Sequence, residues 1–210
     1  MHHYKYTMKI NWFLSFAGAV LVAGCTGVGV VQSSDPLAKL NTAETLFMEQ
    51  DRPLLAEKLI REAMAIYQER DDPHGLGNSY REYADLLRSG SVSGKWENYY
   101  RKNGFQDTSV TFDNRLTKAK EYYKKALNYY ASAEGRFQKS ERFDMLTNVY
   151  YNMANTSSFL DDPVNACKYY DRALGSYDES IRRNPSVKPY SPSGTVAELI
   201  WKMKRQTGCS

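Results

Sequence analysis

The sequence predicts an all-α fold of stacked helical hairpins, and three observations support this prediction. A twelve-residue pattern occurs three times, at 56–67, 119–130 and 166–177. Each copy has alanine at its first and eighth positions, a bulky residue at the fifth and tyrosine at the twelfth. At about 100° per residue these positions share one narrow arc of a helix, and the alanines let a second helix approach closely. Asp-Pro pairs, which are typical of helix starts, precede several of the predicted helices.

Residues 1–24 resemble the signal peptide of a bacterial lipoprotein. Lys9 precedes an apolar stretch over 12–22, and a Val-Ala-Gly-Cys sequence then ends at Cys25. In the lipobox that this sequence resembles, small residues admit the signal peptidase and the cysteine thiol is acylated. An uncleaved membrane anchor is the alternative, because apolar and small residues continue to Val31.

Processing at Cys25 would place the protein in the bacterial envelope. The mature chain would begin at this cysteine, carry acyl chains such as palmitate and have no transmembrane helix. Residues 25–35 are expected to form a flexible tether, since they are mostly small and polar and include glycine. The residue after Cys25 is Thr26, not the aspartate that by family analogy retains lipoproteins at the inner membrane. The resemblance therefore implies a lipid anchor in the outer membrane, with the protein facing the periplasm.

The first hairpin is expected over residues 36–70. Asp35 precedes Pro36, as a capping residue followed by proline in the first turn of a helix. The apolar positions of this first helix are Leu37, Leu40, Leu46 and Phe47. After a turn at 51–53, the first alanine-bearing helix completes the hairpin.

A second motif marks the first helices of the next two hairpins. Its members are Leu76, Gly77, Tyr80 and Ala84 in the second unit, and Leu146, Tyr150 and Ala154 in the third. A Leu-Gly-x-x-Tyr helix paired with an alanine-bearing helix resembles the tetratricopeptide repeat, in which about 34 residues form two antiparallel helices. The resemblance implies a solenoid of about three repeats over residues 36–183.

An insertion at about 89–115 interrupts the second repeat. It contains too many aromatic residues for simple disorder, so we expect an ordered excursion with a short helix near 95–102. Aromatic side chains and arginine dominate interface energetics, which makes five residues candidates for partner binding: Trp96, Tyr99, Tyr100, Arg101 and Phe105. The alternative is that the aromatic residues pack back over the second repeat and complete its core.

Residues 184–210 are expected to form a proline-bearing linker and a C-terminal capping helix. Thr195 and Glu198 fit a capping box. An apolar face follows, formed by Val196, Leu199, Ile200 and Met203. Such a helix would cover the apolar end of a solenoid. An amphipathic helix that binds a partner is the alternative.

No arrangement of residues typical of an enzyme is present in the sequence. It lacks Cys-x-x-Cys, His-Glu-x-x-His, Gly-x-Gly-x-x-Gly and P-loop motifs, so we predict no catalytic residues, no metal site and no cofactor. Cys167 is not expected to be a nucleophile, because His74 is the only histidine after Cys25. Cys167 and Cys209 are instead a candidate disulfide in an oxidising periplasm.

The charge pattern does not indicate nucleic-acid binding. The formal net charge is +4, or about +2 without the predicted signal peptide. Lysine and arginine are scattered along helix faces and do not form a basic stripe. Protein partners are therefore expected, together with the membrane through the N-terminal lipid.

In the family that the chain resembles, the first helices of successive repeats line a concave groove. Eight side chains are predicted to face it: Asn41, Thr45, Asn78, Arg81, Glu82, Asn148, Tyr151 and Asn152. Asparagines two residues before a repeat's tyrosine resemble those that hold an extended peptide through side-chain amides. The alternative is that all eight are solvated helix positions.

The resemblance implies a non-catalytic scaffold or adaptor lipoprotein that holds a periplasmic or outer-membrane protein. Lipoproteins of this kind serve secretion, pilus assembly or the positioning of cell-wall enzymes. A periplasmic immunity protein that occludes a delivered toxin is the main alternative. An envelope hydrolase is the remote one.

Overall fold

The computed structural model describes residues 33–184, 190–191 and 194–209, and their fold is all-α, as predicted. The helices are α1 (Pro36–Met48), α2 (Pro53–Glu69), α3 (Pro73–Arg88), α4 (Gly90–Ser93), α5 (Glu97–Asn103), α6 (Arg115–Lys139), α7 (Phe143–Phe159), α8 (Pro163–Arg183) and α9 (Val196–Gln206). A two-residue pairing of β1 (Tyr190–Ser191) with β2 (Gly194–Thr195) precedes α9. All these elements lie in one unit, residues 32–210. The predicted signal peptide at 1–24 and Cys25 lie outside the described residues.

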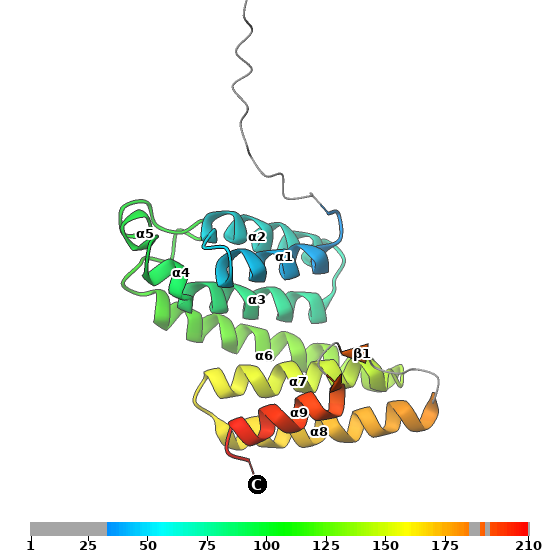
Figure 1. Ribbon diagram of the computed structural model, residues 1–210. Helices are drawn as coiled ribbons and strands as arrows, with labels where there is room; N and C mark the ends of the chain where they lie inside the picture. Colours follow the sequence, from blue (N-terminus) through cyan, green and yellow to red (C-terminus); the bar gives the residue numbers. More distant parts are fainter. Residues whose placement is uncertain (1–32, 185–189, 192–193, 210) are drawn as a thin grey trace, which may run out of the picture. The chain divides into compact units, whose positions relative to one another are not determined.

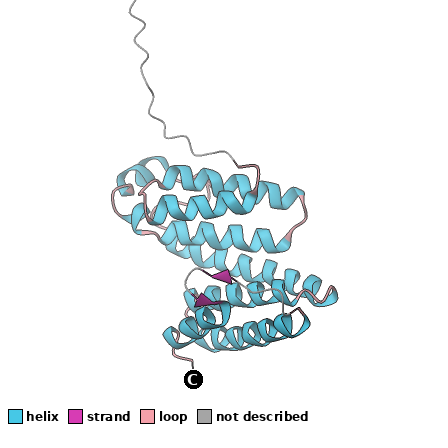
Figure 2. Cartoon of the chain, turned by 45° about the vertical axis from the view of Figure 1, so that its right-hand side comes forward, coloured by secondary structure: helices cyan, strands magenta, loops and turns pink. Residues whose placement is uncertain are grey.

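Three helical hairpins stack in chain order (Figure 1). Helix α1 packs on α2, α3 packs on α6, and α7 packs on α8. Neighbouring hairpins meet where α2 contacts α3 and where α6 contacts α7, and α3 also contacts both α1 and α7. Figure 2 shows the same layers from a second direction. The first helices of the three hairpins therefore line one side of the stack.

The repeated twelve-residue pattern forms the packing face of α2, α6 and α8. Nearly all its members are buried: Ala56, Ile60, Ala63 and Tyr67 in α2, Ala119, Tyr123, Ala126 and Tyr130 in α6, and Ala166, Tyr170 and Ala173 in α8. Tyr177 is the exception and is partly exposed. The packing stripe predicted from the sequence is confirmed, because small alanines let the paired helices approach closely while the larger members fill the remaining space.

Aspartates begin three of the helices, as the Asp-Pro pairs predict. The side chains of Asp35, Asp72 and Asp162 accept hydrogen bonds of 3.0, 3.0 and 3.1 Å from backbone N–H groups in the first turns of α1, α3 and α8. Each bond satisfies a donor that has no partner inside the helix.

Four turns between helices use an acidic residue in the left-handed region, which the sequence analysis did not identify. These residues are Asp51 (φ 53°), Asp71 (φ 47°), Glu141 (φ 54°) and Asp161 (φ 60°). In the turn after α2, the backbone N–H of Asp72 donates to the carbonyl of Tyr67 at 3.0 Å, which satisfies an acceptor at the helix end. The repetition of this turn gives the successive helices similar connections.

The insertion is ordered, and it packs on the first hairpin. Its predicted short helix is α5. The indole Nε1 of Trp96 donates to the carbonyl of Asp51 at 2.8 Å, in the turn between α1 and α2. The backbone N–H of Gln106 donates at 2.7 Å to Glu57, a buried carboxylate that also accepts a 2.8 Å bond from the Tyr83 hydroxyl. These contacts join the insertion to α2 and α3.

Helix α9 packs on α8. Thr195 and Glu198 form the predicted capping box, with bonds of 3.2 Å and 2.8 Å between the side chain of each and the backbone N–H of the other. Ile200 is fully buried among apolar side chains of α6, α7 and α8. A disulfide joins Cys167 of α8 to Cys209, with 5.5 Å between their Cα atoms. The helix thus covers apolar surface of the last hairpin.

Replacing Gly77 by alanine should destabilise the fold. A Cβ at this position would lie 2.5 Å from Cε1 of Tyr130 in α6, so α3 and α6 would have to move apart. Such overpacking costs about 1–3 kcal/mol in the free energy of unfolding, measurable by urea denaturation. Gly135→Ala is the matched control, since a Cβ there meets no atom within 4 Å. It should stabilise α6 by about 0.5–1 kcal/mol, and equal stabilities of the two variants would contradict the described packing.

Removing the disulfide should loosen the C-terminal end. It spans a sequence separation of 42 residues, and the double variant Cys167→Ser, Cys209→Ser should lose about 2–4 kcal/mol of stability because its unfolded chain is less constrained. Urea denaturation measures the loss, and hydrogen exchange should locate it in α9. Wild-type protein treated with dithiothreitol should match the variant, and a wild type insensitive to reductant would argue against the bridge.

Candidate functional site

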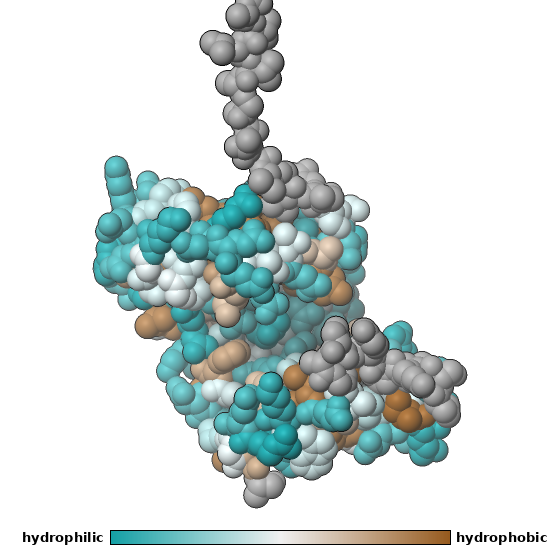
Figure 3. All heavy atoms as spheres, viewed as in Figure 1, coloured by the Kyte–Doolittle hydropathy of each residue, from teal (hydrophilic) through white to brown (hydrophobic). Residues whose placement is uncertain are grey.

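A cavity of about 370 Å³ opens where the C-terminal ends of α1, α3 and α7 come together. Its lining residues are Glu44, Phe47 and Met48 from α1, Arg81, Glu82, Asp85 and Arg88 from α3, Ser89 and Gly90 after it, and Phe159 from α7. Figure 3 shows hydrophobic patches beside hydrophilic ones on the face that carries α1 and α7. We call the surface formed by α1, α3 and α7 the groove, and this opening the groove cavity.

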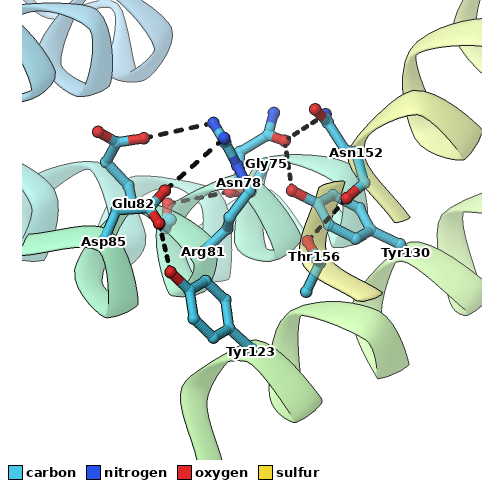
Figure 4. Close-up of polar contacts among 10 residues, drawn as sticks. Gly75, Asn78, Arg81, Glu82, Asp85, Tyr123, Tyr130, Asn152 and Thr156 are labelled. Atoms are coloured by element: carbon cyan, nitrogen blue, oxygen red, sulfur yellow. Dashed lines mark hydrogen bonds and ion pairs between the residues drawn. The ribbon is translucent and has the colours of Figure 1, made fainter. Parts of the chain in front are cut away.

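Two predicted groove asparagines meet across the junction between the second and third hairpins. The Oδ1 atom of Asn78 in α3 accepts a 3.0 Å bond from Nδ2 of Asn152 in α7 and a 2.9 Å bond from the hydroxyl of Tyr130 in α6 (Figure 4). The amide of Asn78 therefore links three helices. Because the bonds fix its orientation, it is held in place before any ligand arrives.

Arg81 is the cation at the centre of the groove. Its guanidinium lies 3.3 Å from Oε2 of Glu82 and 3.7 Å from Oδ2 of Asp85 (Figure 4). The hydroxyl of Tyr123 in α6 donates to Asp85. One arginine is thus shared by two carboxylates, on a helix turn that faces the groove cavity.

Burial changes the protonation of this cluster. It raises the pKa of Glu82 to about 8, and the carboxylates of Asp85 and Glu44 act in the same direction while Arg81 opposes them. Burial also raises the pKa of Asp85, against the opposing effects of Arg81 and the Tyr123 hydroxyl. At neutral pH Glu82 therefore holds a proton in a large share of the molecules.

The other predicted groove residues differ in how accessible they are. Asn41 and Asn148 are exposed, and Thr45 is half-buried with its hydroxyl 3.2 Å from the carbonyl of Asn41. Tyr151 is also half-buried, and its ring lies 6.3 Å from that of Tyr170, so it contributes to packing between α7 and α8. The structure therefore joins Asn78 to Asn152 and Arg81 to Glu82, whereas none of the other four predicted residues bonds to these side chains among the contacts described.

For two of the five insertion residues, the predicted contact with a partner is wrong. Tyr100 is 1 % exposed and Phe105 is 6 % exposed, and their rings stack with centroids 4.2 Å apart. They form a small core beneath α5, because two large rings gain more from each other than from water. The burial expected by the alternative interpretation is found for these two, but the insertion packs on the first hairpin and does not complete the core of the second.

The other three insertion residues retain accessible surface. Trp96 is partly exposed, with its indole N–H bonded to the first hairpin, and Tyr99 is 41 % exposed. Arg101 is exposed and pairs with Glu97 at 2.7 Å and with Asp113 at 2.6 Å.

Several groove residues were not predicted from the sequence. Arg88 lies with its guanidinium 4.8 Å from the ring centre of Phe159, and its Nη1 donates to the Tyr123 hydroxyl at 2.9 Å. A signal for both existed, because Arg88 and Phe159 each follow a predicted groove residue, Arg81 or Asn152, by seven positions. Seven residues return a helix to the same face.

Two general features of the described residues bear on function. Within 33–184, 190–191 and 194–209, no three His, Cys, Asp or Glu side chains are placed to hold a metal ion. In the same part of the chain, no helix combines the length and the apolar character needed to cross a bilayer. Comparison with protein-family models, with curated proteins and with solved structures found no match to this chain.

The protonation of Glu82 should appear in the pH dependence of stability. The folded state holds this proton up to a pKa of about 8, whereas the unfolded state releases it near 4.5. The contribution of this proton to the free energy of unfolding is thus complete below pH 4.5. It is lost as the pH rises toward 8, by up to about 1.4 kcal/mol per pH unit. Glu82→Gln removes this titration, so its stability relative to wild type should increase between pH 5 and pH 8.

Urea denaturation at the two pH values measures this difference. Glu69→Gln is the control, since Glu69 is an exposed glutamate of α2. Its stability relative to wild type should not change with pH. A pH-independent difference between Glu82→Gln and wild type would show that Glu82 is ionised in the folded protein.

Proposed function

We propose that the protein is a non-catalytic scaffold resembling tetratricopeptide-repeat proteins, and that its groove holds an extended segment of a partner protein. In this proposal the hairpins α1–α2, α3–α6 and α7–α8 are the three repeats, and α9 is the cap. Their equivalent buried stripes support this, because each hairpin buries its apolar face against its neighbours.

The groove cavity is the observation that carries the proposal. Its volume of about 370 Å³ is at the small end of the range for binding pockets, which leaves room for a side chain of a bound segment. Nearby, the ordered amides of Asn78 and Asn152 offer polar groups to a peptide backbone, and their mutual bond reduces the entropy lost on binding. An extended chain needs both elements, since backbone contacts supply affinity and side-chain pockets supply specificity.

We infer further that the scaffold acts in the bacterial envelope, anchored through acylated Cys25 and facing the periplasm. The lipobox-like sequence supports the anchor. The disulfide between Cys167 and Cys209 supports an oxidising compartment, because such bonds persist outside the cytosol. A membrane-tethered scaffold would keep its partner close to the outer membrane.

Site-specific photocrosslinking in intact cells tests this function. A benzoylphenylalanine at Asn148, which is exposed on α7 of the groove, should capture a discrete partner. The same residue at Asn128, an exposed asparagine of α6, is the matched control and should capture far less. In cells that also carry Cys25→Ala, the crosslinked complex should leave the membrane fraction. Equal crosslinking from both positions, or none from Asn148, would count against the groove as a binding surface.

A further inference from the structure

The walls of the groove cavity combine apolar and acidic side chains. Met48 is 66 % exposed and Phe159 is 38 % exposed, whereas Phe47 is buried beside them. The two exposed apolar side chains come from α1 and α7, on either side of α3. An elongated side chain entering the cavity would therefore contact apolar atoms along its length.

Acidic groups outnumber basic groups among the lining residues. Glu44, Glu82 and Asp85 are the acids, and Arg81 and Arg88 are the bases. Arg81 is shared between two carboxylates, at 3.3 and 3.7 Å. Arg88 bonds to the Tyr123 hydroxyl and covers the rings of Tyr123 and Phe159. Among the described residues, Glu44 is exposed on α1 and lies beyond direct ion-pair distance of both arginines.

When Glu82 is ionised, one of its carboxylate oxygens lacks a hydrogen-bond donor. Glu82 is 3 % exposed, and its Oε1 atom is buried without a hydrogen-bond partner among the described residues. Figure 4 shows its carboxylate linked to Arg81 through the other oxygen. A buried acceptor without a partner costs about 1–3 kcal/mol, so a ligand that donates to it gains affinity.

We propose that the groove cavity receives a lysine or arginine side chain of the bound segment, whose N–H donors meet Oε1 of Glu82 and the carboxylate of Glu44. This inference rests on the proposed function and specifies the chemistry of the partner. The aliphatic stem of the cationic side chain lies along Met48 and Phe159, as such stems do on apolar surfaces. When Glu82 is ionised, the acids of the cavity exceed its bases, which favours a cation over an anion.

Proton release should accompany this binding. The groups that face Glu82 are Glu44 of α1, Arg81, Asp85 and Arg88 of α3, and Tyr130 of α6. Burial raises the pKa of Glu82 to about 8, and a cation beside it favours the ionised form. Affinity for a cationic ligand should therefore increase between pH 6 and pH 8.5.

Short peptides test the proposal on the full chain. The probes are blocked pentapeptides Gly-Ala-X-Ala-Gly in which X is lysine, arginine, norleucine or glutamate, titrated into isotope-labelled protein and followed by NMR. The lysine and arginine peptides should shift the amide signals of Glu82 and Phe159. Norleucine keeps the stem without the charge, and should bind at least about tenfold more weakly, equivalent to about 1.4 kcal/mol.

Variants assign the effect to the two carboxylates. Glu82→Gln together with Glu44→Gln should reduce affinity for the lysine peptide at least about tenfold and remove its pH dependence. Glu69→Gln removes a carboxylate outside the cavity and is the control, which should bind like wild type. Circular dichroism of each variant checks that the helices are intact.

Three results would overturn the inference. They are equal binding of the lysine and norleucine peptides, stronger binding of the glutamate peptide, and no shift with the lysine peptide at about 10 mM, a concentration that detects even millimolar affinity. Photocrosslinking from Asn148 separates these failures from failure of the proposed function. If a partner is captured at Asn148 but the peptides show no preference for a cation, the proposed scaffold function is retained and only the cation pocket is rejected.

Discussion

The close approach of paired helices at small residues is the constraint on which the rest of this structure depends. Ala63, Ala126 and Ala173 are fully buried at equivalent places in three hairpins, and Gly77 lies directly against the ring of Tyr130. A larger side chain at any of these positions would separate two helices. Close packing of the hairpins in turn brings α1, α3 and α7 near enough for side chains from all three to line one cavity.

Several polar side chains of the groove already form hydrogen bonds or ion pairs with other residues of the same chain. Asn78 is held by Asn152 and Tyr130, and Asp85 is held by Arg81 and Tyr123. The tyrosines belong to the same helix that supplies the alanine stripe of the second hairpin. The residues that build the core thus also orient the polar side chains of the groove.

Sequence reasoning succeeded where the signal was local and periodic. The alanine stripes, the Asp-Pro starts and the capping box at Thr195 each depend on residues within about three helical turns, so a single sequence shows them. Helical spacing predicted that Asn78, Arg81, Glu82 and Asn152 share one face, and the structure places their side chains in contact in two pairs. The docking of Trp96 on the carbonyl of Asp51 could not be predicted in this way, since it joins residues 45 positions apart. The burial of Tyr100 and Phe105 could not be predicted either, because a segment rich in aromatic residues can form a buried core or an exposed binding surface.

The attachment of the insertion to the first hairpin has a consequence for how the chain folds and unfolds. An array in which each repeat touches only its neighbours can fray from either end, one hairpin at a time. Here Glu57 of α2 accepts hydrogen bonds from both Tyr83 and the backbone of Gln106, 49 residues further along the chain. The first hairpin therefore cannot open without releasing the insertion and the start of the second. These segments should behave as one cooperative unit, which protects the N-terminal hairpin of the domain from local unfolding.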